Sequence, residues 1–94
     1  MDEITHQHSG ARGAFVIVRD GQTLAQMTYT VGGAIAIIDH TEVDDVLRGT
    51  GTGARLVKAA VQWARAERMQ LMPLCPFAKS VFDKTPDYGD VLKQ

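Results

Sequence analysis

Three glycines at alternate positions, Gly49, Gly51 and Gly53, have the clearest chemical consequence in this sequence. Glycine inside a helix costs about 1 kcal/mol relative to alanine, so the run predicts a turn and not a helix interior. An amphipathic pattern follows at once, so the turn leads into a helix N-terminus, where unpaired amides and the positive end of the dipole attract anions. Arg48 and Arg55 add positive charge on either side. The run therefore predicts a phosphate or pyrophosphate site.

The spacing of the glycine run separates it from two common phosphate motifs. A nucleotide P-loop has lysine and then serine or threonine after its last glycine, whereas Ala54 and Arg55 follow here. The dinucleotide fingerprint requires Gly-x-Gly-x-x-Gly, and this run is Gly-x-Gly-x-Gly. The order Arg-x-x-Gly-x-Gly entering a helix resembles the coenzyme A pyrophosphate loop of the GNAT superfamily of N-acetyltransferases. Residues 43–49 resemble its strand exit, with Asp45 and Leu47 where proline and an aromatic residue are common.

His40 and Glu42 carry groups that suit acetyl transfer. The reaction needs a base that takes the proton of the amine, and donors for the carbonyl oxygen as negative charge develops. The two residues are two apart on a predicted strand and therefore on one face, and a histidine with an ordinary pKa near 6.5 suits a base at neutral pH. The alternatives are that His40 caps the strand end or bonds a neighbouring backbone group, and that Glu42 is an ordinary exposed carboxylate.

Cys75 stands at the end of a predicted strand, just before a predicted helix. It is either an acyl-accepting nucleophile with a lowered pKa, a residue that lines the thioester pocket, or a buried structural cysteine. Its position favours membership of a site, and direct transfer in a ternary complex is the expected mechanism. Tyr88 is a candidate proton donor to the departing thiolate or, more simply, a packing residue. No metal is expected, because only His6 and His8 have a local ligand spacing.

Two further segments make the resemblance more specific. Residues 40–43, the glycine loop and residues 73–78 together resemble the compact, single-domain GNAT-type acetyltransferases, and the resemblance extends from about Gly13 to the C-terminus. It implies that acetyl-CoA binds in a splayed V between two parallel strands, with His40 and Cys75 lining the site. It also implies main-chain bonds from residues 41–43 to the pantetheine arm and loop amides on the pyrophosphate. The implied cofactor-binding residues are Thr41, Glu42, Val43, Arg48, Gly49, Thr50, Gly51, Thr52, Gly53 and Ala54.

The first half of the chain predicts strands that lead to His40. Residues 13–19 and 24–30 are strand-like runs on either side of Asp20-Gly21, a strong hairpin turn. Residues 34–43 form a third run, apolar early and polar late. Residues 4–8 predict a short edge strand. This half is therefore an antiparallel meander whose last strand ends in polar side chains.

The second half predicts a helix and a parallel strand. The apolar stripe of the helix consists of Leu56, Val57, Ala60, Val61 and Ala64. Residues 69–75 then predict a strand parallel to residues 35–43, because a right-handed helical crossover connects them. Pro73 prevents full pairing and leaves a gap of the kind where open sheets bind ligands. Residues 77–84 form a short helix after Pro76.

After this short helix, Pro86 ends the helical pattern. The tail of residues 87–94 is expected to lie back on the sheet through Tyr88, Val91 and Leu92.

Length and composition restrict the class of protein. The 94 residues make one domain, residues 1–94, with an ordinary content of charged and hydrophobic residues. A formal net charge of −1 gives no reason to expect nucleic acid or an acidic membrane as partner. The single cysteine excludes an internal disulfide and suits a reducing compartment. No apolar run reaches the ~18 residues of a membrane span, and the acidic start is not a signal peptide, so a cytoplasmic monomer or weak dimer is expected.

Together these patterns predict an α+β fold of the GNAT-like α/β type. It has a mostly antiparallel sheet with a splayed parallel strand pair, one main crossover helix and a short C-terminal helix. The expected activity is transfer of an acetyl group from acetyl-CoA to an unidentified amine, on a small molecule or a protein. The alternative is a non-catalytic module that binds CoA or acyl-CoA and acts in regulation or interaction. If the glycine loop were only a structural turn, the protein would have no affinity for CoA.

Overall fold

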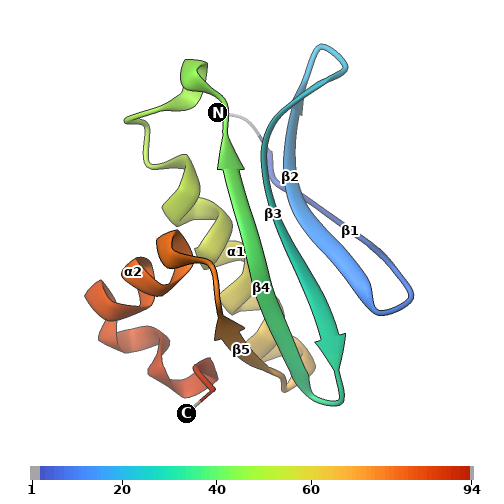
Figure 1. Ribbon diagram of the computed structural model, residues 1–94, viewed down its shortest axis with the longest axis vertical. Helices are drawn as coiled ribbons and strands as arrows, with labels where there is room; N and C mark the ends of the chain where they lie inside the picture. Colours follow the sequence, from blue (N-terminus) through green and yellow to red (C-terminus); the bar gives the residue numbers. More distant parts are fainter. Residues whose placement is uncertain (1–2, 94) are drawn as a thin grey trace.

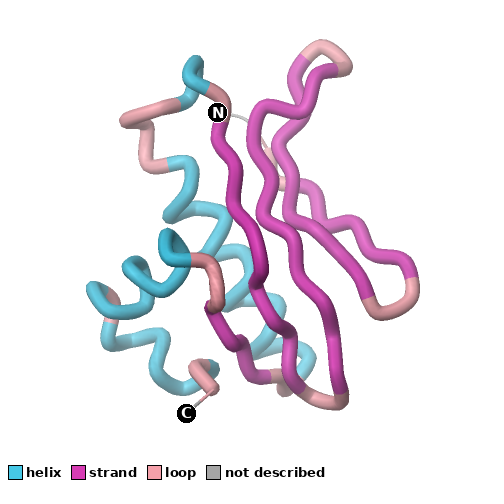
Figure 2. Tube along the Cα trace, in the orientation of Figure 1, coloured by secondary structure: helices cyan, strands magenta, loops and turns pink. Residues whose placement is uncertain are grey.

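A five-stranded sheet forms the frame of the computed structural model, which describes residues 3–93 (Figures 1 and 2). The elements in chain order are β1 (Thr5–Ser9), β2 (Arg12–Arg19), β3 (Gln22–Gly32), β4 (Ile35–Val43), the 3₁₀ turn η1 (Asp45–Leu47), α1 (Thr52–Glu67), β5 (Gln70–Pro73), α2 (Pro76–Lys84) and the 3₁₀ helix η2 (Pro86–Val91). The strands are ordered β1-β2-β3-β4-β5; the first three pairings are antiparallel and the last is parallel. The predicted fold class is confirmed.

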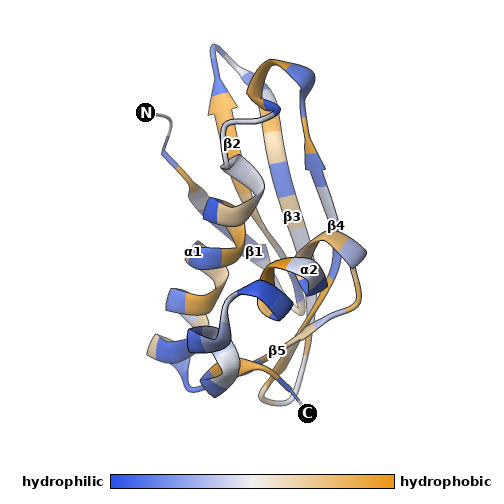
Figure 3. Ribbon diagram, turned by 90° about the vertical axis from the view of Figure 1, so that its left-hand side faces the viewer, coloured by the Kyte–Doolittle hydropathy of each residue, from blue (hydrophilic) through white to orange (hydrophobic). Residues whose placement is uncertain are grey.

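Both helices pack on one face of the sheet, in front of the strands in Figure 3. One hydrophobic core joins the inward residues of β2, β3 and β4 to the two helices. The predicted stripe of α1 is fully buried in it, and Ala78 and Phe82 of α2 extend it. Within residues 3–93, no helix covers the opposite face of the sheet. No helix in that range is long and apolar enough to cross a membrane.

The parallel pair separates at Pro73, as expected. Four residue pairs join β4 to β5, from Ile35 opposite Gln70 to Ile38 opposite Pro73. The Ile38 carbonyl then accepts bonds from both the Leu74 and Cys75 amides, at 3.0 and 3.1 Å. Beyond this point β4 continues without β5, as Figure 1 shows. Proline has no amide hydrogen to extend the ladder, so the chain turns away into α2.

A β-bulge interrupts the pairing of β3 with β4. Thr28 lies opposite His40 and Tyr29 lies opposite Ile38, so Asp39 is the extra residue on β4. The Asp39 carboxylate accepts hydrogen bonds from the hydroxyls of Thr28 and Thr30. A bulge of this kind bends the strand and redirects the side chains beside it. Here it lies next to the predicted catalytic histidine.

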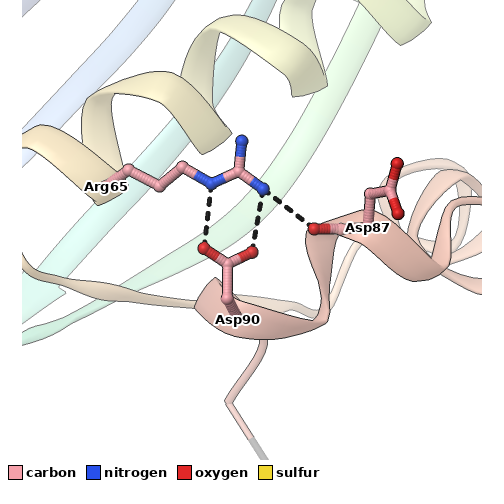
Figure 4. A network of polar contacts seen from close by, with 3 residues as sticks. All are labelled: Arg65, Asp87 and Asp90. Atoms are coloured by element: carbon pink, nitrogen blue, oxygen red, sulfur yellow. Dashed lines mark hydrogen bonds and ion pairs between the residues drawn. The ribbon is translucent and has the colours of Figure 1, made fainter.

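The C-terminal segment is fastened to α1 and β5. Figure 4 shows the Arg65 guanidinium, which donates to both oxygens of the Asp90 carboxylate, at 2.9 and 2.8 Å, and to the Asp87 carbonyl at 2.8 Å. The hydrogen bond from Arg65 holds the pKa of Asp90 below its ordinary value. The Lys93 amide donates to the Leu71 carbonyl at 2.8 Å. The predicted tail therefore does return to the sheet, although its first part is the 3₁₀ helix η2 and Gln94 lies outside the described residues.

Several boundaries differ by one or two residues from those predicted; β5, predicted over residues 69–75, spans Gln70–Pro73, and β1, predicted over residues 4–8, spans Thr5–Ser9. β3 continues to Gly32, so the turn before β4 is shorter than expected. α1 begins at Thr52, which places Gly53 inside its first turn although the glycine run was predicted to be a turn only. The cost of glycine is small there because first-turn amides have no carbonyl partner within the helix. The ring of Phe77 packs directly on Gly53 and would collide with any Cβ at that position.

Candidate functional site

The loop that leads into α1 contains backbone conformations that favour glycine. Gly49 and Gly51 have φ angles of 74° and 77°, in the left-handed region that other residues rarely adopt. Gly51 is the N-cap of α1, and no side chain caps the helix there. The first turn of α1 therefore presents amide donors that no capping side chain accepts, at the positive end of a helix of 16 residues. This is the anion-binding geometry that the glycine run predicts.

Two threonine hydroxyls hold the shape of this loop. Thr50 Oγ1 donates to the Leu47 carbonyl at 2.5 Å and lies 2.6 Å from Thr52 Oγ1. Because the Thr50 proton is used on Leu47, the proton between the two hydroxyls comes from Thr52. Thr52 is only 3% exposed. Both hydroxyls are therefore engaged in bracing the loop.

A cavity of ≈ 570 Å³ lies between this loop, the end of β4 and helix α2. Its wall includes eight of the ten predicted cofactor residues; Glu42 and Thr50 do not line it. The full lining is Thr41, Val43, Leu47, Arg48, Gly49, Gly51, Thr52, Gly53, Ala54, Phe77, Ser80, Val81, Lys84 and Thr85. The last five, from α2 and the residue after it, were not predicted to line a site. The spacing of these five residues predicts only an amphipathic helix. That they line a cavity follows from the way α2 packs against α1, which the sequence does not show.

Arg48 lies at the cavity wall, and its side chain is exposed. Its Nε is 3.1 Å from the Asp45 carboxylate, and the two side chains are 78% and 86% exposed. An ion pair this exposed contributes little to stability, so the guanidinium exchanges this partner readily for another anion. Lys84, at the far end of α2, adds a second basic side chain to the same wall. The cavity is thus bordered by positive charge and by the positive end of α1.

The residues of β4 alternate between two different surfaces. Thr41 and Val43 lie opposite Met27 and Ala25, which are buried on the helix side, and both line the cavity. His40 and Glu42 lie on the open side. His40 Nε2 is 3.0 Å from Glu42 Oε1, which confirms that the two side chains share a face.

Cys75 lies on the helix side of β4 and is 7% exposed. Its Sγ donates to Thr41 Oγ1 at 3.4 Å. Burial alone would raise the pKa of the thiol, but the Thr41 hydroxyl and the amides of Ala78, Phe77 and Thr41 outweigh it and lower the pKa. The two helix amides act through their field, since Cys75 makes no side-chain capping bond to α2.

The structure therefore brings Cys75 to Thr41 and not to His40. The thiol is behind the cavity wall formed by Thr41, whereas the imidazole is on the opposite side of β4. The sequence indicates that both residues are near the splay, but it does not indicate that a strand separates them. Tyr88 packs edge-on against Phe82, at 5.8 Å between ring centroids, as a packing residue would. Within residues 3–93, no group of three or more potential ligand side chains is arranged to hold a metal ion.

Replacing Thr41 with valine is expected to raise the pKa of the Cys75 thiol. Valine keeps the shape of threonine but removes the hydroxyl, which accepts from the thiol and, once the thiol is ionised, turns to donate to the thiolate and so favours it. At any pH below the midpoint, the thiolate fraction then falls. Thiolate ultraviolet absorbance against pH measures the midpoint, and Thr41→Ser, which keeps the hydroxyl, is the matched control. Equal midpoints in the wild type and the valine variant would show that the hydroxyl does not act on the thiol.

Comparison with known proteins gives the family. The model of the GCN5-related N-acetyltransferase family matches residues 14–91, most of the chain. The chain belongs to this family. A GCN5-like protein from Staphylococcus aureus, whose solution structure is known, is 32% identical; the match covers 99% of this chain and 91% of that one, with a TM-score of 0.72. The two domains thus agree in sequence and fold over almost their whole length.

More distant structures of the family share the fold. The ribosomal-protein-S18-alanine N-acetyltransferase of Escherichia coli is 15% identical, with a TM-score of 0.68 over 82% of this chain and 53% of its own. A Bacillus anthracis protein described as a streptothricin acetyltransferase, solved with acetyl coenzyme A, is 24% identical, with a TM-score of 0.58 over 70% of this chain and 39% of its own. The chain therefore spans only about half of these longer enzymes. No curated protein matches the sequence.

Proposed function

We propose that this protein transfers the acetyl group of acetyl-CoA to an amine. The observation that carries the proposal is the cavity that begins at the uncapped amides of α1 and reaches Thr41 at the splayed end of β4. The pyrophosphate would lie on the amides of residues 49–54, beside Arg48. The pantetheine arm would follow the main chain of residues 41–43, which β5 leaves unpaired. Its thioester end would then lie near Cys75.

The chemical step forms one bond and breaks one. The neutral amine attacks the thioester carbonyl, a nitrogen–carbon bond forms, the carbon–sulfur bond breaks, and CoA leaves as a thiolate that takes a proton from water. We assign His40 as the base that takes the proton of the amine. The Glu42 carboxylate accepts the Nε2 proton of His40, which leaves Nδ1 as the basic nitrogen. The amine would approach from the open face of the sheet, where His40 lies.

Calorimetric titration of the protein with acetyl-CoA tests the first half of the proposal. We expect a single site that also binds CoA, because the pyrophosphate and pantetheine are common to both. Mass spectrometry then follows acetylation of a polyamine, a lysine peptide and a peptide with a free α-amino group. The expected result is binding together with acetylation of at least one of these amines. The absence of any heat at millimolar ligand would overturn the proposal.

The same experiment separates the second candidate function from the first. One observation favours a module that binds acyl-CoA without turnover: no helix covers the acceptor side of the sheet within residues 3–93. Tight binding with no acetylation of any of the three amines, and no CoA released over the uncatalysed rate, would identify such a module. The glycine loop would then serve recognition alone.

A further inference from the structure

A cluster of four rings fastens the edge strand β1 to helix α1. His6 stacks on Phe15 of β2, with ring centroids 4.2 Å apart and an interplanar angle of 9°. Trp63 of α1 meets the His6 ring edge-on at 5.1 Å. His6 Nε2 lies 2.5 Å from the Tyr29 hydroxyl of β3. His6 thus contacts strands β2 and β3 and the main helix α1.

His6 is the side chain through which β1 reaches the core; besides it, β1 is attached by its five-pair ladder with β2 and by Ile4, which precedes the strand and packs on the core. Of its five residues, His6 alone is partly buried and the other four are exposed. The strand lies at the edge of the sheet and pairs only with β2. A short edge strand with little buried surface opens more easily than the rest of a domain. The state of His6 therefore changes how firmly β1 is held.

A hydrogen bond from the Tyr29 hydroxyl to His6 Nε2 requires His6 to be neutral. Tyr29 is 3% exposed and its ring covers Gly13 so closely that no Cβ would fit there. Burial raises the pKa of Tyr29, so the phenol keeps its proton. In the tautomer of neutral His6 that carries its proton on Nδ1, Nε2 accepts that proton in a hydrogen bond. Protonation of His6 would place a second hydrogen between these two atoms. The Tyr29 proton would then have to turn away from Nε2, and the hydrogen bond in its present direction would be lost.

The surrounding charges act on this equilibrium in both directions. His8, on the same strand, has its ring 5.6 Å from His6 and repels a second positive charge. Glu67 of α1 lines a small cavity of ≈ 220 Å³ with His8, Tyr29 and Trp63, and it would attract that charge. The face of Phe15 also attracts a cation. Burial, followed by the repulsion from His8, has the larger effect, so the pKa of His6 is lowered from its ordinary value of 6.5.

We propose that His6 is a pH-sensitive latch, and that its protonation releases β1 from the sheet edge. Because the pKa of His6 is lower in the folded protein than in the released strand, the released state binds more protons. The latch is thus strongest above about pH 6.5, the ordinary histidine pKa, and weakens as the pH falls towards the lower, folded value. Release would uncover the edge of β2 and the rings of Phe15 and Trp63.

Amide hydrogen exchange of β1 tests the latch directly. In the wild type, we expect the protection of the β1 amides, corrected for intrinsic exchange, to fall by about tenfold per pH unit between the two pKa values. The protection of β3 and β4 should not change. Trp63 is the only tryptophan in the chain, so its fluorescence should report the same transition.

His6→Phe and His8→Gln form the matched pair of variants. Phenylalanine keeps a ring for stacking but cannot be protonated, so the pH response of β1 and of Trp63 should disappear. His8→Gln removes the repelling neighbour but keeps the latch, so a smaller response should remain at a higher midpoint. A full response in His6→Phe would overturn the proposal. If that variant does not fold, the wild type still decides, because a His6 ring that titrates with no change at β1 or Trp63 also overturns it.

Discussion

Aspartate at Gly51 is expected to weaken acetyl-CoA binding about tenfold or more relative to asparagine at the same position. Gly51 has a φ of 77°, and asparagine and aspartate are the residues that tolerate this left-handed conformation best after glycine. No atom lies within 4 Å of a Cβ built there, so both side chains have room. The two variants have the same shape and strain, and they differ in one negative charge beside the proposed pyrophosphate.

The expected size follows from electrostatics. Two like charges about 4 Å apart repel by about 1 kcal/mol in water and by about 4 kcal/mol near a protein surface. Calorimetric titration of both variants with acetyl-CoA, at low and high salt, measures the difference. Acetyl-pantetheine, which has no pyrophosphate, is the control ligand and should bind both variants alike. Equal affinities for acetyl-CoA in two variants with equal melting temperatures would place the pyrophosphate elsewhere.

The helices and strands of this fold can be predicted from the sequence because its local signals agree with one another. Asp20-Gly21 marks the hairpin between β2 and β3, and the apolar stripe of α1 specifies both the helix and its buried face. Pro73 predicts where β4 and β5 stop pairing, since proline lacks the hydrogen that the ladder needs. The same local chemistry predicts the turn at Gly49 and Gly51. It misplaces Gly53, because the close packing of Phe77 on that residue is a tertiary contact.

The geometry of the site is less accessible from the sequence. Alternation along a strand places His40 with Glu42 and separates them from Thr41, but it does not say which face the helices cover. The bulge at Asp39, which shifts the register beside His40, has no sequence signal that distinguishes it from a regular strand residue. Likewise, His6 gives only a weak metal pattern with His8, whereas the structure places it among three aromatic rings from distant parts of the chain.

Replacing His40 with glutamine is expected to reduce acetyl transfer by about 10²–10⁴-fold, the range typical for loss of a general base. The Kd for acetyl-CoA should stay unchanged, because the His40 side chain is on the open face and does not line the cavity. Glutamine keeps a donor for Glu42 but has no basic nitrogen. Steady-state kinetics with an amine acetylated by the wild type, together with calorimetry, separates the two quantities. Turnover equal to that of the wild type would exclude His40 as the base.

Cys75→Ser completes this test, because the two mechanisms differ in what they need from the thiol. Direct transfer needs only His40 and a bound amine, so the serine variant should keep most of its activity. An acyl-enzyme route needs the Cys75 sulfur, so that variant would be as inactive as His40→Gln. The wild type mixed with acetyl-CoA alone would then gain one acetyl group by intact mass. We expect no such adduct, because the thiol is 7% exposed, is bonded to Thr41 and does not line the cavity that would hold acetyl-CoA.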